Sequence, residues 1–219
     1  MLDTETIMMR VEGTRDTLYM TLMSTLFGYV LGLPMGIILT VTDKDGIRPN
    51  AAVYKVLDVI VNILRSVPFL ILLILVMPFT KAIVGKTYGS TATIVPLVIA
   101  AAPFIARMVE SSLKEVDPGV IEAAVSMGAG TGTVIWKVML AEARTSLLVG
   151  VTIAIGTILG YSAMAGTVGG GGLGDIAIQY GYYRYETEIM IVTVVVLVVL
   201  VQILQSIGMM VSRKLDKRK

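Results

Sequence analysis

The sequence contains no cysteine and no histidine. Thiol nucleophiles, disulfide bonds, imidazole bases and the usual zinc ligands are therefore excluded, and we expect neither a catalytic residue nor a metal site. Charged residues make up only 16% of the chain, against roughly a quarter in an average soluble domain. The net charge of +2 is too small to indicate a nucleic-acid partner.

Apolar residues dominate the chain, at 55% of its length. Several apolar runs approach the roughly 20 residues that a helix needs to cross a bilayer, which predicts an all-α integral membrane protein. We expect a single transmembrane domain over 1–219 with five membrane-spanning helices, at about residues 18–41, 56–78, 91–108, 146–165 and 189–211.

The lysines and arginines between these spans indicate the orientation, because cytoplasmic loops are enriched in them. With the N-terminus outside, twelve lie on the inner side: Lys44, Arg48, Lys55, Arg107, Lys114, Lys137, Arg144, Arg213, Lys214, Lys217, Arg218 and Lys219. Five lie on the outer side: Arg10, Arg15, Lys81, Lys86 and Arg184. We therefore predict an N-out, C-in topology. Acidic residues near the N-terminus argue against a cleaved signal peptide: Asp3, Glu5, Glu12 and Asp16.

A glycine-rich stretch, MAGTVGGGGLGD, follows the fourth predicted span. Gly169, Gly171 and Gly174 satisfy the G-x-G-x-x-G spacing of dinucleotide-binding folds. That motif requires a strand before it and a helix after it in a βαβ unit, whereas here a membrane span precedes it on the outer side. A flexible or tightly packed re-entrant turn is the expected structure, and any nucleotide binds elsewhere.

Glycines also recur within the first and fourth predicted spans. Gly28, Gly32 and Gly36 are four residues apart, and Gly156 and Gly160 repeat the spacing. Small residues at this interval let membrane helices pack closely. A moving hinge is the alternative function of these glycines.

Three polar residues lie in the second predicted span. Asp58, Asn62 and Arg65 are spaced i, i+4, i+7 and so share a helix face. Polar groups at membrane depth usually face a water-filled cavity, which would make them the lining of a pathway. Alternatively, residues 56–64 form an interfacial helix and the span begins near Ser66.

The third predicted span contains two prolines, Pro96 and Pro103. We expect both to interrupt the helix, because proline removes a backbone hydrogen bond. Broken helices are common around transport pathways.

The long inner loop, residues 117–143, is the most informative segment. Asp117 can cap a helix at residues 118–127 that begins with Pro118, and Gly128 suits the position just beyond its C-terminus. A second short helix is expected at residues 134–143. A helix of about ten residues is marginal alone in water, so it must pack under its own membrane domain or dock into a partner's groove.

The stretch EAAVSMGAG within this loop resembles the EAA loop of ABC-importer permeases. Glu122, Ala123, Ala124 and Gly128 match the motif, whereas Ala141 replaces the proline of its usual Leu-Pro end. The resemblance implies that this segment, with Met127, forms a coupling helix that docks into an ATPase.

Four further stretches resemble the methionine-importer permeases: RSVPFLILLILVMPFTKAIVG, APFIARMVE, GYSAM and GGLGDIAIQYGY. This resemblance implies a multi-pass protein of the prokaryotic inner membrane that transports L- and D-methionine. It also implies a homodimer with two cytosolic ATPases, which bind ATP and Mg²⁺ in place of any cofactor on this chain, and an external binding protein, often a lipoprotein. The 14 methionines themselves do not indicate the substrate, because methionine is simply an adaptable apolar residue.

The GYSAM stretch ends the fourth predicted span. Tyr161, Ser162 and Met164 lie near its outer end, where a flexible apolar side chain could plug a pathway. The alternative is that Met164 faces lipid or a neighbouring helix.

Other functions are open to a chain of this kind. An ion-coupled carrier or channel would need buried acidic residues, for which Asp58 is the candidate. An intramembrane enzyme would need a catalytic pair that the sequence does not place mid-membrane. Within the permeases, another amino acid or a small peptide is the alternative substrate.

Overall fold

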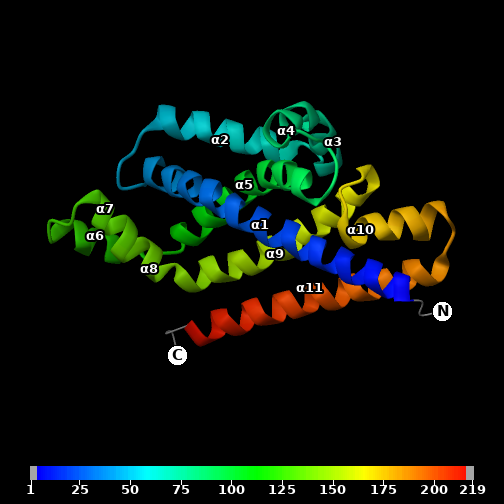
Figure 1. Ribbon diagram of the computed structural model, residues 1–219. Coiled ribbons are helices and arrows are strands. Elements are labelled where there is room, and N and C mark those ends of the chain that lie inside the picture. The colour runs from blue at the N-terminus through cyan, green and yellow to red at the C-terminus, as the bar shows by residue number, and fades with distance from the viewer. Residues whose placement is uncertain (1–3, 216–219) are drawn as a thin grey trace.

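A computed structural model describes residues 4–215, and Figure 1 shows that they form a helical bundle. No strand occurs within this range. The longer helices are α1 (Thr4–Thr42), α2 (Ala51–Ser66), α5 (Ser90–Lys114), α9 (Arg144–Ala165) and α11 (Thr187–Leu215). The shorter ones are α3 (Phe69–Leu75), α4 (Met77–Val84), α6 (Pro118–Ser126), α7 (Thr131–Thr133), α8 (Leu140–Glu142) and α10 (Gly172–Ile176). A 3₁₀ turn, η2 (Gly166–Val168), and two π-helical segments, η1 (Val134–Met139) and η3 (Ala177–Tyr183), complete the order. Lys217, Arg218 and Lys219, on which the predicted orientation partly rests, lie outside the described residues, as does Asp3 of the signal-peptide argument.

Four helices of the described range are long and apolar enough to cross a membrane: α1, α5, α9 with its following turn, and α11. They contain four of the five predicted spans. α1 has 39 residues and so is about 58 Å long, well beyond the roughly 30 Å of a bilayer core.

The remaining predicted span, residues 56–78, is not one straight helix. α2 and α3 are bent by 103° at the break between them, and together they form a fifth candidate span. Val67 is extended, with φ −80° and ψ 124°, because the ring of Pro68 disfavours a helical conformation in the residue before it. The break directly follows Ser66, and both interpretations of this segment, a lining span and an interfacial helix, stay open.

α1 packs along α5 through its glycine face. A Cβ atom on Gly32 would lie 2.7 Å from the carbonyl oxygen of Ala102, and one on Gly36 would lie 2.6 Å from that of Ala106. Gly28 likewise faces α5. These glycines serve packing within one chain, so they do not support the use of this face between two copies.

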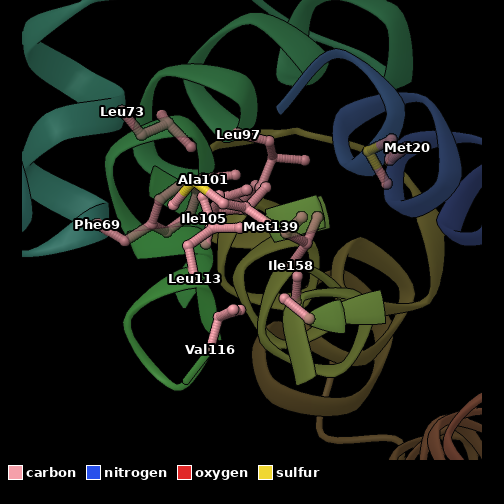
Figure 2. Packing of buried hydrophobic residues seen from close by; sticks show 14 of the residues in the cluster. Met20, Phe69, Leu73, Leu97, Ala101, Ile105, Leu113, Val116, Met139 and Ile158 are labelled. Atoms are coloured by element: carbon pink, nitrogen blue, oxygen red, sulfur yellow. The ribbon is translucent and has the colours of Figure 1, made fainter. Parts of the chain in front are cut away.

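α5 remains a single helix through Pro96 and Pro103, so the prediction that both prolines interrupt it is wrong. Both prolines are buried, and neighbouring helices in a membrane domain stabilise a helix whose hydrogen bonds proline removes. The main core surrounds α5, and Figure 2 shows its side chains gathered from several helices. Phe69 of α3, Ile105 of α5 and Ile158 of α9 belong to it.

The bundle has two distinct ends in Figure 1. One end, here termed the α6 end, carries α6, α7 and the C-terminal ends of α1 and α11. The other, the α10 end, carries the N-terminus, α10 and the connection from η3 to α11. The segment from 131 to 142 is helical throughout, in three pieces, and so confirms the second helix expected in the long loop.

Candidate functional site

The first element of the candidate site is α6, whose ends are fixed by local sequence. The Asp117 side chain accepts a hydrogen bond of 2.7 Å from the Gly119 amide, and Pro118 occupies the first turn. At the other end Gly128 has φ +80°. The Gly128 and Ala129 amides donate to the carbonyl oxygens of Val125 and Ala124, at 2.9 and 3.1 Å. This pair of bonds is a Schellman motif and confirms the predicted caps.

The faces of α6 differ in what they contact. Ala124 is 6% exposed and belongs to the main core, with Ile121 packed beside it. Ala123 and Glu122 are exposed, and Met127 is 82% exposed. Contrary to expectation, Ala124 is buried within its own chain, in the same core as Val134 and Met139 of η1, so it is not available for close approach to a partner in this conformation.

Trp136, the single tryptophan of the chain, lies on η1 next to this helix. It is 67% exposed, and Val125 of α6 is 52% exposed. Trp136 is not among the predicted site residues. The signal that could have found it is that Trp136 is the only aromatic residue of the loop 117–143.

A groove of about 850 Å³ separates α6 from the loop between α1 and α2. Asp43, Asp45 and Glu122 line it together with Lys44 and Lys114. The loop and α6 thus face each other across a groove that has both charged and apolar walls.

Asp58 and Asn62 of α2 both contact α5. Arg107 of α5 contacts the Asp58 carboxylate and donates a 2.9 Å hydrogen bond to the Asn62 side-chain oxygen. Arg65 does not join these contacts with Arg107 and instead borders a small cavity near Phe69. Two of the three predicted lining residues therefore hold α2 against α5.

The ion pairs continue along α5. Arg107 also binds Glu110 at 2.7 Å, Lys114 binds Glu110 at 2.8 Å, and Lys114 reaches Asp43 at 2.6 Å. The hydrogen bond from Lys114 lowers the pKa of Asp43 below its usual value. We term Asp43, Asp58, Arg107, Glu110 and Lys114 the α5 ion cluster. The only sequence signal for this cluster was the spacing of Arg107, Glu110 and Lys114, which follow one another at three and four residues along α5.

The three predicted gate residues point in different directions. Tyr161 stacks on Phe69 with ring centroids 4.6 Å apart. Ser162 is 1% exposed and donates to the Leu159 carbonyl oxygen at 2.8 Å, so it does not line a pathway in this conformation. Met164 is 51% exposed. Met164 is thus the most exposed of the three.

The glycine-rich stretch is tightly packed. Of the two expectations, a flexible turn and a tightly packed turn, the structure has the second. The Leu173 amide donates to the Thr17 hydroxyl at 2.8 Å, and the Gly89 amide donates to the Gly169 carbonyl oxygen at 2.9 Å. A Cβ on Gly172 would lie 2.6 Å from the same Thr17 oxygen. Gly172 therefore packs directly against α1.

The glycines of the fourth predicted span differ from each other. A Cβ on Gly156 would lie 2.7 Å from the amide nitrogen of Gln205 on α11, whereas one on Gly160 would meet nothing within 4 Å. Gly156 therefore packs within the chain and Gly160 does not. Among the described residues no group of three acidic side chains could hold a metal ion.

Comparison with known proteins shows the family. The model of the binding-protein-dependent transport system inner membrane component matches residues 32–218. The chain belongs to this family. The residues matched include α6, Trp136 and the α5 ion cluster.

Curated relatives match nearly the whole chain. A probable D-methionine transport system permease protein of Vibrio cholerae is 54% identical over 208 residues, which cover 95% of this chain and 92% of that protein. The methionine import system permease protein of Bacillus subtilis is 46% identical over 94% of this chain and 93% of its own length.

The fold matches a solved transporter closely. The inward-facing MetNI methionine ABC transporter, in its native CY5 crystal form, has a chain that superposes with a TM-score of 0.97. That chain is 46% identical, and the match covers 99% of this chain and 100% of the other. The helical architecture described above is therefore the membrane fold of an ABC permease.

Proposed function

We propose that this chain is the permease subunit of an ATP-driven importer and forms the translocation pathway for methionine. The observation that carries the proposal is 54% identity over 95% of the chain to a protein named as a D-methionine permease. The TM-score of 0.97 to a methionine ABC transporter supports it. The chain is no enzyme in this assignment, since ATP and Mg²⁺ bind to a separate ATPase.

The α6 end faces the cytosol in this proposal. The loop after α1, the segment between α7 and α8, and the C-terminal end of α11 lie there. They carry Lys44, Lys137, Arg213 and Lys214, so the positive-inside rule favours that side. Two copies of the chain are expected to assemble with two ATPases at this end and an external binding protein at the α10 end.

The coupling surface for the ATPase comprises Glu122, Val125, Met127 and Trp136. Exposed methionine and tryptophan side chains are unfavourable in water, and burying each stabilises a complex by about 1.5–3 kcal/mol. Tryptophan is enriched among the residues that dominate binding energy. Ala124 and Gly128 act indirectly, by packing α6 and by directing the chain out of it.

The gate is assigned to Met164. Its side chain is exposed near the α10 end of α9, where Gly160 leaves an open helix face one turn away. A second copy of the chain packed on this face would place two Met164 side chains near the two-fold axis. Both would then close the pathway from opposite sides.

Isolation of the tagged chain from membranes tests the assignment. An ABC ATPase should co-purify with it in equal amount, and ATP hydrolysis should rise when methionine and its binding protein are added. Isolation of the permease without an ATPase, at full yield, would instead favour an ion-coupled carrier. Stimulation by another amino acid but not by methionine would reassign the substrate.

A further inference from the structure

A groove of about 590 Å³ runs between the N-terminal part of α1 and α11. One face of α1 forms its floor, with residues recurring every three or four positions: Ile7, Arg10, Val11, Thr14 and Leu18. Val196 of α11 forms the far wall, and Arg15 stands at the edge. The groove lies at the α10 end, away from the coupling surface.

The apolar walls of this groove are uncovered. Ile7 is 45% exposed and Val11 is 63% exposed. Leu18 begins the apolar run of α1, and Val196 lies within that of α11. The groove therefore continues from the charged start of α1 into the membrane, whichever side of the membrane the α10 end faces.

Two arginines give the groove a cationic end. The Nε atom of Arg10 is buried and has no hydrogen-bond acceptor within residues 4–215. Arg15 has a 3.4 Å contact with Asp16, whose other oxygen accepts a 2.5 Å hydrogen bond from Ser90. Arg10 as a whole is half-buried and the Arg15 side chain is 75% exposed, so an anionic ligand at this end of the groove would meet both positive charges.

We propose that this groove binds a phospholipid with a net negative headgroup. The phosphate accepts hydrogen bonds from the guanidinium groups of Arg10 and Arg15, which match the geometry of phosphate oxygens. The acyl chains lie along Leu18 and Val196. A cationic end joined to an apolar wall at the membrane boundary suits an amphiphile, as in other basic pockets between membrane helices.

Native mass spectrometry of the purified complex, isolated in mixed phosphatidylglycerol and phosphatidylcholine of equal chain length, tests the proposal. The wild type should retain phosphatidylglycerol in preference to phosphatidylcholine. The Arg10→Gln/Arg15→Gln variant should lower this preference about tenfold, the effect of losing one charge-assisted hydrogen bond. The control is Lys81→Gln/Lys86→Gln, which removes the same charge from positions outside the groove and should leave the preference unchanged.

A second pair of variants keeps the test independent of the arginines. Val11→Trp fills the groove and should also reduce phosphatidylglycerol retention, whereas Val30→Trp, at a position exposed to 58% elsewhere on α1, should not. Equal retention of both lipids by the wild type would overturn the proposal. So would displacement of the lipid by millimolar inorganic phosphate, which would show that the headgroup alone is recognised.

A protein occupant is the third outcome. The chain has no cysteine, so Val11→Cys introduces a unique thiol for a photoreactive label in intact membranes. Labelling of lipid is the expected result. Crosslinking to a second copy of the chain or to another protein would overturn the lipid assignment.

Discussion

Arg107 of α5 binds Asp58 of α2 across 49 positions of sequence. Arg107 also holds Glu110, whose side chain is only 6% exposed. The two contacts place one guanidinium between a partly exposed and a nearly buried carboxylate. The α5 ion cluster therefore fixes α2 beside the helix that leads directly into α6.

Replacement of Arg107 should destabilise the permease. Arg107→Met leaves Glu110 buried with one cation fewer, and breaking a buried ion pair costs about 3 kcal/mol. The melting temperature in detergent should fall clearly, while Lys81→Met, at an exposed position, should leave it nearly unchanged. Partial recovery is expected in Arg107→Met/Asp58→Asn, since Lys114 still pairs with Glu110 and Asp58 is the carboxylate that loses its cation. Equal melting temperatures for Arg107→Met and Lys81→Met would show that the cluster does not hold α2.

Gly128 and Gly132 form a matched pair for the coupling loop. A Cβ on either residue would meet nothing within 4 Å, but Gly128 alone has a positive φ, of +80°. Gly128→Ala should therefore cost about 1 kcal/mol or more and change how the chain leaves α6. We expect it to weaken ATPase association and uptake, whereas Gly132→Ala keeps both. Equal activity of the two variants would exclude a role for this turn in coupling.

Met127 and Trp136 should contribute directly to ATPase binding. Met127→Glu and Trp136→Ala should each weaken association by tenfold or more, about 1.5 kcal/mol, with little change in permease stability. Ala124→Leu should do the reverse and lower stability by about 1–3 kcal/mol, because it overpacks the core. Because the chain has a single tryptophan, a permease labelled with 5-fluorotryptophan reports this surface as one ¹⁹F resonance. A resonance that does not change when the ATPase is added would remove Trp136 from the interface.

Met164 should approach its counterpart in a second copy. In the cysteine-free background, Met164→Cys is expected to form a disulfide between two permeases in intact membranes. Leu22→Cys, at a position exposed to 48% on α1, measures random collision and should crosslink far less. A gating role also requires that Met164→Ala raise ATP hydrolysis without substrate. If Met164→Cys crosslinks no more than the control, Met164 faces lipid.

Local sequence signals predicted the parts of the site that local interactions stabilise. Asp117, Pro118 and Gly128 each define an end of α6 through contacts within a few residues, and the structure has all three in the expected roles. Comparison with known proteins also confirmed the predicted family. The family could be predicted because the EAA pattern lies within one continuous segment of the sequence.

Features that depend on distant contacts were not predictable in the same way. The sequence around Ala124 reads the same whether Ala124 faces a partner or the core. Only the burial of Ala124 in the folded chain shows that it faces the core. The contact of Asp58 and Asn62 with Arg107 was not predictable either, because Arg107 lies far away in sequence. The effect of a proline also could not be predicted from the sequence. The chain turns sharply at Pro68, whereas α5 continues through the buried Pro103.

Transport by the reconstituted complex tests the proposed function most directly. Vesicles containing the permease and its co-purified ATPase are loaded with ATP, and radiolabelled methionine and the binding protein are added outside. Methionine should accumulate only when ATP is present inside, and dissipating the proton and sodium gradients should leave the rate unchanged. Accumulation without ATP that follows an ion gradient would contradict an ATP-driven permease.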